Sequence, residues 1–132
     1  MTGFLDTNIL VYAFQRNDHR QPRAKMLLDG GNRIAVQSLN EFALVAVRKL
    51  RMEWMELDQA LDALATLTLP PVALTLEIHR HGLDLCRRHQ LSIYDSMLVA
   101  AALHARCRTF WSEDLHDGLV IDGRLTIRNP FV

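Results

Sequence analysis

The sequence predicts a single α/β domain, a three-layer α/β/α sandwich around a short central parallel sheet. Short apolar runs of strand character alternate with longer segments of helical periodicity, which is the pattern of a parallel sheet whose strands are connected by helices. Residues 94–105 are apolar on almost every face, and such a helix belongs in the middle of a fold. The 132 residues suit one domain, 1–132, without repeats or linkers.

The N-terminal third opens with a strand and its helix. Residues 2–6 form a short apolar run typical of a buried strand, and residues 8–16 have the pattern of the helix that follows. A second helix is expected over 19–29, because its proline lies in the first turn and a Gly-Gly pair closes it. Residues 34–36, Ile-Ala-Val, predict a second short strand.

Helices dominate the middle of the chain. We expect them over 38–50 and 56–67, and again over 76–89 after the Pro70-Pro71 pair, which separates two helical patterns. The fully apolar helix 94–105 comes next.

Strands return at the C-terminal end. Residues 109–111 predict a third strand, and residues 119–127 contain short β-type runs around an Asp-Gly turn.

The composition restricts the function classes. Lys plus Arg equals Asp plus Glu at 15 each, so the chain is not the strongly basic kind that coats nucleic acid, and RNA contact must come from local clusters. Any one basic cluster is more often a solvated helix face. With only Cys86 and Cys107, no leader pattern and no membrane-length apolar run, the sequence predicts a cytoplasmic protein with reduced thiols. The local basic clusters that could contact RNA are Arg16, Arg20, Arg23 and Lys25, then Arg48, Lys49 and Arg51, then Arg87, Arg88 and His89.

Four acidic segments follow predicted strands or open the buried helix. In an open parallel sheet, sites form at the carboxyl ends of the strands. The carboxylates that reach this edge are Asp6, Glu41, Asp95 and Asp114.

Helix capping is the competing explanation for each acid taken alone. Ser38-x-x-Glu41 and Ser92-x-x-Asp95 match the capping box, and Asp6 or Asn8 could cap the first helix. Helical spacing argues against capping alone, because it places Glu41 and Asp95 on stripes shared with apolar residues, facing the core.

Buried carboxylates without nearby Lys or Arg require another partner. A cluster of them either takes up protons or binds cations, and all-oxygen ligands favour Mg²⁺ or Mn²⁺. Hard cations on carboxylates serve phosphate-ester chemistry, by polarising the phosphoryl oxygen and activating water. Thr7, Asn8 and Ser112 would then orient the acids or contact phosphate.

FLDTNILVYA, VQSLNEF, IYDSMLVAAAL and WSEDLHDG, in this order, together with the closing VIDGRLTIRNPF, resemble the PIN domain, and most closely the VapC toxins of bacterial toxin–antitoxin pairs. The resemblance covers essentially the whole chain. It implies a Mg²⁺- or Mn²⁺-dependent ribonuclease in which Asp6, Glu41, Asp95 and Asp114 hold the metal. Glu113 and Asp117 crowd the same turn as Asp114, and Asp114 fits the motif best. The resemblance also implies a homodimer and a small antitoxin that places a basic side chain in the acidic pocket.

Other functions remain open from the sequence. The chain could be a PIN nuclease that processes RNA outside a toxin–antitoxin pair, or a PIN-like module that binds RNA or protein without catalysis. A phosphatase with an aspartate nucleophile is disfavoured, because Asn8 stands where it needs a second acid, and no Gly-rich phosphate loop is present. Trp54 and Met55 could form part of a dimer or antitoxin groove, but core packing is the favoured expectation. His79 and His81, two apart on a helix, are a poor metal clamp.

Overall fold

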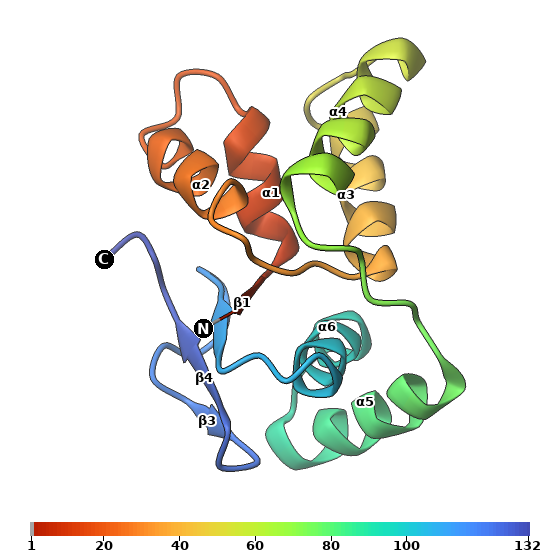
Figure 1. Cartoon of the computed structure of the whole chain (residues 1–132), viewed down its shortest axis with the longest axis vertical. Helices are drawn as coiled ribbons and strands as arrows, with labels where there is room; N and C mark the ends of the chain where they lie inside the picture. The colour runs from red at the N-terminus through yellow and green to blue at the C-terminus, as the bar shows by residue number, and fades with distance from the viewer. Residues whose placement is uncertain (1) are drawn as a thin grey trace.

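A computed structural model describes residues 2–132, in which six helices lie between the first strand and the last three. In chain order they are β1 (Gly3–Leu5), α1 (Thr7–Phe14), α2 (Gln21–Leu28), α3 (Val36–Arg48), α4 (Trp54–Leu67), α5 (Leu76–His89), α6 (Ile93–His104), β2 (Thr109–Trp111), β3 (Val120–Ile121) and β4 (Leu125–Arg128) (Figure 1). Among these residues, no helix is both long and apolar enough to cross a membrane.

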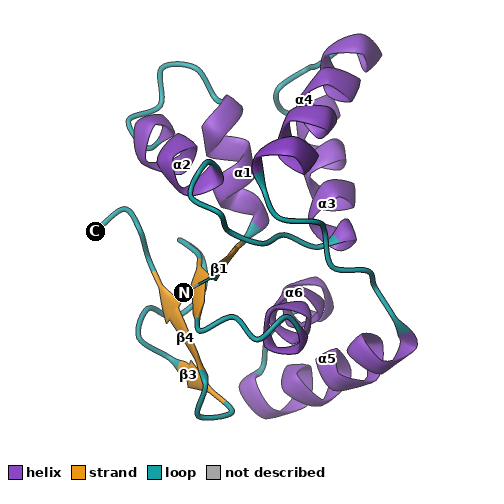
Figure 2. Cartoon of the chain, in the orientation of Figure 1, coloured by secondary structure: helices purple, strands orange, loops and turns teal. Residues whose placement is uncertain are grey.

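The strands form one sheet in the order β1-β2-β4-β3 (Figure 2). β1, β2 and β4 run parallel, as expected, and Phe4 pairs with Phe110, which pairs with Ile127. The two-residue strand β3 pairs antiparallel with β4 across the Asp-Gly turn. Because β1 and β2 are parallel neighbours, their carboxyl ends lie side by side.

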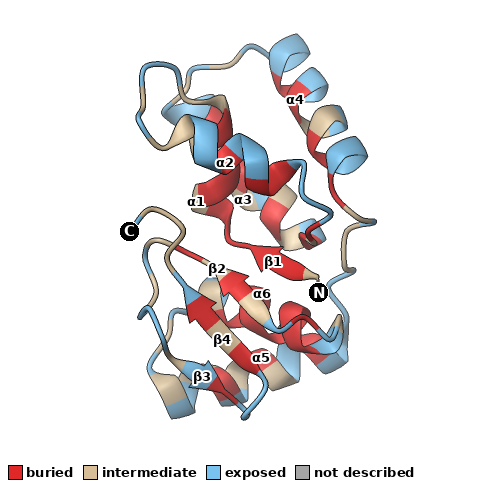
Figure 3. Ribbon diagram, turned by 60° about the vertical axis from the view of Figure 1, so that its left-hand side comes forward, coloured by how far each residue is buried: buried red, intermediate tan, exposed pale blue. Residues whose placement is uncertain are grey.

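Alternation along the strands divides the core into two layers. Phe4 and Phe110 stack at 5.4 Å on the face covered by α5 and α6. Leu5 and Trp111 point to the opposite face, toward α1–α4. Figure 3 shows α1–α4 on one side of β1 and α5 and α6 on the other. The α/β/α sandwich that the sequence predicts is therefore the observed architecture.

The expected strand over 34–36 is wrong. Ala35 makes an isolated parallel bridge to Val72, and Arg33 makes one to Phe4, but neither extends into a ladder. Pro70 and Pro71 precede Val72 and have no N–H to continue the pairing. The chain turns into α3 at Val36 instead.

The early start of α3 also overturns the capping box that Ser38-x-x-Glu41 suggested. Ser38 lies inside the first turn, where its Oγ accepts the backbone N–H of Ala35 at 3.0 Å. Glu41 therefore has no capping function, and its side chain is free for the site.

Core packing of Trp54 and Met55 is wrong as well. Their side chains are 74% and 73% exposed, because α4 begins at Trp54 and its first turn faces solvent. Glu53 is the residue before the helix, and its backbone N–H donates to Glu56 Oε1 at 3.3 Å. The side of α4 that packs inward begins at Leu57.

Candidate active site

All four predicted carboxylates line one cleft of about 880 Å³. Asp6 follows β1 and Asp114 follows β2, so the parallel pairing of these strands brings them to the same edge of the sheet. Glu41 reaches the cleft from α3 and Asp95 from the first turn of α6. Two strand ends and two helices therefore bring the four acids to one cleft.

Asp6 is the most buried of the four, with 5% of its surface exposed. The Ser112 hydroxyl donates to its Oδ2 at 2.7 Å, and the Thr7 N–H donates to its Oδ1 at 2.7 Å. Asp6 is thus the N-cap of α1, a position that the sequence also allowed for Asn8. The Asp6 side chain therefore both caps α1 and lines the cleft.

Asn8 connects the first and fourth acids. Its Nδ2 donates to Asp114 Oδ2 at 3.0 Å and lies 3.5 Å from Asp6 Oδ2. Its Oδ1 is buried without a hydrogen-bond partner among the described residues. A buried acceptor of this kind is uncommon in proteins and suits a donor or cation that enters the cleft.

Glu41 and Asp95 are half-buried, and each has a local partner. The Thr7 hydroxyl donates to Glu41 Oε1 at 3.4 Å and the Gln37 amide to Oε2 at 3.1 Å. Ser92 is the N-cap of α6 and accepts the Asp95 N–H at 3.1 Å, so the expected serine cap is confirmed there. The cap uses the backbone of Asp95, and its carboxylate still lines the cleft.

The three acids after β2 point in different directions. Asp114 lines the cleft and accepts from Asn8. Glu113 Oε1 accepts the Tyr12 hydroxyl at 2.8 Å, and Asp117 Oδ1 accepts the backbone N–H of Asn129 at 2.9 Å. The geometry therefore favours Asp114 as the fourth acid of the cleft.

Burial and mutual repulsion raise the pKa values of three of the carboxylates. Desolvation raises the pKa of Asp6 to about 7 despite the Ser112 hydrogen bond, and the charges of Asp95 and Glu41 raise it further. The pKa values of Glu41 and Asp95 are raised by burial first, then by Asp95 and Asp114 respectively. At neutral pH the Asp6 carboxyl is therefore partly protonated, and a bound cation would displace this proton.

The donors present have the chemistry of a hard-cation site. Carboxylate, amide and hydroxyl oxygens surround the cleft, with no histidine or cysteine among its lining residues. Within residues 2–132, however, no three Asp, Glu, His or Cys side chains are grouped so that they could hold an ion as they stand. The carboxylates share a cleft, and the side chains would have to turn toward a common point to bind one.

Several residues that line the cleft were not predicted from sequence as site residues. Gln37, one helical turn before Glu41, could have been found from its i, i+4 spacing. Arg20 was visible only as part of a basic cluster, and Tyr12 only as an aromatic residue of the first helix. Both line the cleft beside Lys49. His79 and His81 do not share a partner, since His81 faces Asp122 at 3.4 Å while His79 is exposed.

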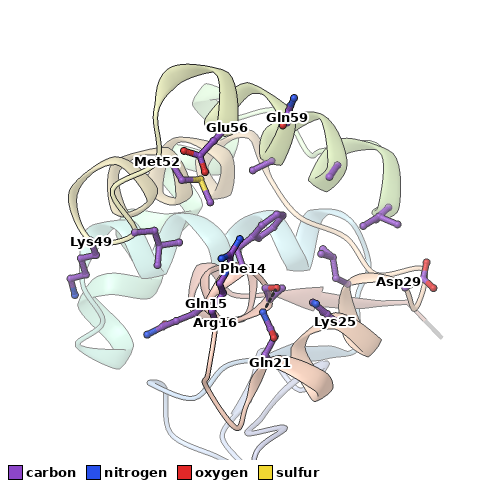
Figure 4. A pocket seen from close by; sticks show the side chains of 16 residues that line it. Phe14, Gln15, Arg16, Gln21, Lys25, Asp29, Lys49, Met52, Glu56 and Gln59 are labelled. Carbon is purple, nitrogen blue, oxygen red and sulfur yellow. Dashed lines mark hydrogen bonds between the residues drawn. The ribbon is translucent and has the colours of Figure 1, made fainter.

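A second cleft, of about 1250 Å³, lies between the α1–α2 segment and α4 (Figure 4). Phe14 and Gln15 enter it from the end of α1, and Met52 and Glu56 enter it from the side of α4. It shares Gln15 and Lys49 with the acidic cleft, so the two are neighbours on the surface.

Solved structures of similar fold come from bacterial toxin–antitoxin systems. A toxin–antitoxin complex from Klebsiella pneumoniae superimposes with a TM-score of 0.73 at 21% identity, covering 99% of this chain and 98% of the other. VapBC2 from Rickettsia felis, bound to a DNA fragment from its promoter, gives 0.69 at 18% identity over 98% of both chains. VapC20 of Mycobacterium tuberculosis, a sarcin–ricin loop cleaving toxin, gives 0.67 at 18% identity over 86% and 92%.

Sequence comparison gives the family directly. No curated protein sequence matches the chain significantly. The family model of the PIN domain matches residues 3–116, which include all four carboxylates of the cleft. The match agrees with the resemblance seen in the motifs and with the fold of the solved neighbours. The chain is therefore a member of the PIN domain family.

Proposed function

We propose that this protein is a divalent-metal-dependent endoribonuclease, the toxin of a VapBC-type toxin–antitoxin pair. One observation carries the proposal: in a PIN domain, carboxylates from four separate elements line a single cleft. Two neighbours of the same fold are described as VapBC2 and as an RNA-cleaving VapC toxin, which supports the choice of RNA and of this branch of the family.

Mg²⁺ or Mn²⁺ would be held by Asp6, Glu41, Asp95 and Asp114. A bound cation of this class neutralises charge on the phosphodiester and lowers the pKa of a water that attacks phosphorus. Its entry would remove the proton that Asp6 retains near pH 7.

The remaining polar residues orient the acids. Ser112 fixes one oxygen of Asp6 through its hydroxyl, and Thr7 fixes the other through its backbone N–H. Asn8 holds Asp114 through its amide, and Thr7 and Gln37 hold the two oxygens of Glu41. Ser92 is the partner of Asp95, because its hydroxyl accepts the Asp95 backbone N–H and its side chain lowers the pKa of the Asp95 carboxyl.

Cleavage of RNA by the purified chain tests this function. Wild type with Mn²⁺ is expected to cut single-stranded RNA internally, and EDTA, Asp6→Asn or Asp95→Asn should each abolish cutting while the circular dichroism spectrum stays unchanged. Asp84→Asn is the matched control, because Asp84 is an exposed acid of α5 that pairs with Arg88 away from the cleft. Cleavage that survives both metal removal and Asp95→Asn would refute the proposal.

Assays on the purified chain, together with growth on expression, distinguish this function from the other PIN-domain functions. RNA cleavage without growth arrest on expression would indicate an RNA-processing nuclease outside a toxin–antitoxin pair. RNA binding with neither cleavage nor Mn²⁺ binding would indicate a non-catalytic module.

An antitoxin fits the surface beside the acidic cleft. The cleft between α1–α2 and α4 is lined by polar and apolar side chains, the latter including Phe14, Leu50 and Leu67, and it continues into the acidic cleft at Gln15 and Lys49. A small antitoxin seated there by apolar side chains could extend a basic residue to the carboxylates. Co-purification of the two chains, and loss of inhibition when that basic residue is replaced, would test this arrangement.

A homodimer and a cytoplasmic site of action complete the proposal. Exposed apolar side chains on α3 and α6, Leu44, Ile93 and Tyr94, provide a surface that a second copy could cover. Both cysteines are free, in keeping with a reducing compartment that contains RNA. Light scattering of wild type against Ile93→Asp would measure the dimer.

A further inference from the structure

A cluster of four polar side chains, two of which line the edge of the acidic cleft, is not explained by metal binding. It consists of Tyr12 of α1, Asp18 and Arg20 from the segment before α2, and Glu113 after β2, and we name it the Arg20 clamp. We propose that the Arg20 clamp positions Asp114, by fixing Glu113 so that the segment after β2 presents Asp114 to the cleft. This inference rests on the proposed function and adds a positioning residue, Glu113, to it.

Glu113 is held by two donors on a single oxygen. The Tyr12 hydroxyl and Arg20 Nη1 both donate to Glu113 Oε1 at 2.8 Å. Arg20 is itself fixed, because its Nε and Nη2 donate to the two oxygens of Asp18 at 2.9 and 2.7 Å. Its guanidinium also lies over the Tyr12 ring, 3.7 Å from the centroid. A carboxylate held by a pre-ordered guanidinium and a hydroxyl loses most of its rotational freedom.

The fixed side chain belongs to a segment whose other residues form the site. Ser112 Oγ donates to Asp6 and accepts the backbone N–H groups of Asp114 and Leu115 at 3.2 and 3.1 Å. The residue on each side of Glu113 is therefore committed to the acidic cleft. Anchoring at both Ser112 and Glu113 leaves the Asp114 side chain directed toward Asn8.

The clamp also keeps a further negative charge out of the cleft. Glu113 is adjacent to Asp114 in the chain, and a released Glu113 could compete for the cation or add to the repulsion among the acids. The ion pair with Arg20 holds the Glu113 carboxylate and offsets part of its charge.

Direct binding of RNA phosphate by Arg20 is the alternative use of this arginine. The charges argue against it, since Arg20 lies between Asp18 and Glu113 and the three groups together carry a net negative charge. Three of its five N–H groups are already used by these carboxylates.

Mn²⁺ binding to the full-length chain, without RNA, tests the proposal. Calorimetry is expected to show that Glu113→Ala weakens Mn²⁺ affinity by about tenfold, the lower end of the effect of losing a supporting group around a metal site. Glu113→Gln keeps an oxygen that can accept from Tyr12 and Arg20, and it should recover most of the affinity. Arg20→Gln should weaken Mn²⁺ binding in the same direction as Glu113→Ala.

Arg88→Gln is the matched control, because Arg88 also bridges two carboxylates, Asp84 and Asp122, away from the cleft. It should leave Mn²⁺ affinity unchanged. Wild-type affinity in folded Glu113→Ala would overturn the positioning role, even if urea unfolding showed a loss of stability. Unchanged Mn²⁺ affinity in Arg20→Gln together with a weaker, less salt-dependent affinity for RNA in EDTA would assign Arg20 to phosphate binding instead.

Mn²⁺ binding by wild type and by Asp6→Asn tests the proposed metal site separately from the positioning role of Glu113. Wild type that binds Mn²⁺, with binding lost in Asp6→Asn, upholds the metal site whatever Glu113→Ala does. Wild type that binds no Mn²⁺ would contradict both the site and the positioning role.

Discussion

Asp6 carries two functions whose energetic demands differ. As the N-cap of α1 it needs only an acceptor, which a neutral carboxyl or an amide also supplies. As the metal ligand that we propose, it would have to be charged, and burial makes that charge costly without a cation. Without a metal, the charged Asp6 side chain therefore lowers the free energy of unfolding.

Asp6→Asn should make the metal-free protein less sensitive to pH. The native pKa of Asp6, about 7, lies above the ordinary aspartate value of 3.8, so the native state binds more protons between these values. The stabilising contribution of Asp6 is present below about pH 4 and is lost as pH rises through 7, by on the order of 4 kcal/mol. Raised pKa values of Glu41 and Asp95 act in the same direction.

Urea unfolding in EDTA from pH 4 to pH 8 measures this effect. Wild type should lose free energy of unfolding over that interval, and Asp6→Asn should lose less. Wild-type and Asp6→Asn curves that run parallel would show that Asp6 does not titrate near neutrality.

Asp114 and Asp117 can be separated by one pair of variants. Asp114→Asn removes a charge from the cleft and should lower RNA cleavage by about two orders of magnitude or more, as loss of a group that acts on the transition state does. Asp117→Asn keeps the oxygen that accepts the Asn129 N–H and should retain wild-type activity. Initial rates on one RNA under saturating Mn²⁺ decide between them, and the opposite ranking would move the fourth acid to Asp117.

α5 and β2 have the bounds that the sequence predicts, and α6 begins and ends within one residue of its predicted bounds, for a physical reason. Eight consecutive residues of α6, Ser96–Leu103, are buried. A helix that is buried on every face must be apolar on every face, so its position can be recognised from the local sequence. The predicted strand over 34–36 is replaced by one bridge between Ala35 and Val72, and α3 begins directly after it. Local sequence does not encode this long-range pairing. Likewise, the sheet order and the contact of Tyr12 with Glu113, 101 residues apart, arise only from the assembled fold.

The contact of α5 with α6 sets the position of Asp95, and Gly82 permits that contact. A Cβ at residue 82 would lie 2.8 Å from Met97 Sδ and 3.3 Å from Ser96 O. Gly82→Ala should therefore lower the free energy of unfolding by about 1 to 2 kcal/mol, although alanine favours a helix.

A double-mutant cycle isolates the cause. In a Met97→Ala background the sulfur is gone, and Gly82→Ala should become neutral or stabilising by up to about 1 kcal/mol through helix propensity. Equal effects of Gly82→Ala in both backgrounds, measured by urea unfolding, would show that Met97 is not the obstacle.

For the molecule as a whole, the acidic cleft exists only when the domain is folded, because strand ends and helices on both sides of the sheet supply it. The four acids could be identified from sequence by their motifs and Gln37 by its spacing to Glu41, whereas the contact of Arg20 with Glu113 required the structure. The chain is neutral overall, so affinity for a cation or a basic partner comes from local concentration of charge.

Mn²⁺ should stabilise the folded protein through this cleft. A ligand at 100 times its Kd adds about 2.7 kcal/mol to the free energy of unfolding, and the gain should shrink below pH 7 as protons compete at Asp6. Thermal unfolding at pH 6 and pH 8, with and without Mn²⁺, checks both statements. Asp95→Asn should reduce the gain, and a gain of equal size in Asp95→Asn would place the bound ion elsewhere.

Mapping of RNA ends after inducible expression of wild type and Asp6→Asn in bacteria tests whether the cleft makes this protein a toxin nuclease. Wild type is expected to arrest growth and to create new internal RNA ends at defined positions within minutes, while Asp6→Asn, present at the same level, creates none. Identical RNA ends in the two strains, or new ends that persist with Asp6→Asn, would contradict the assignment of the acidic cleft as a ribonuclease site.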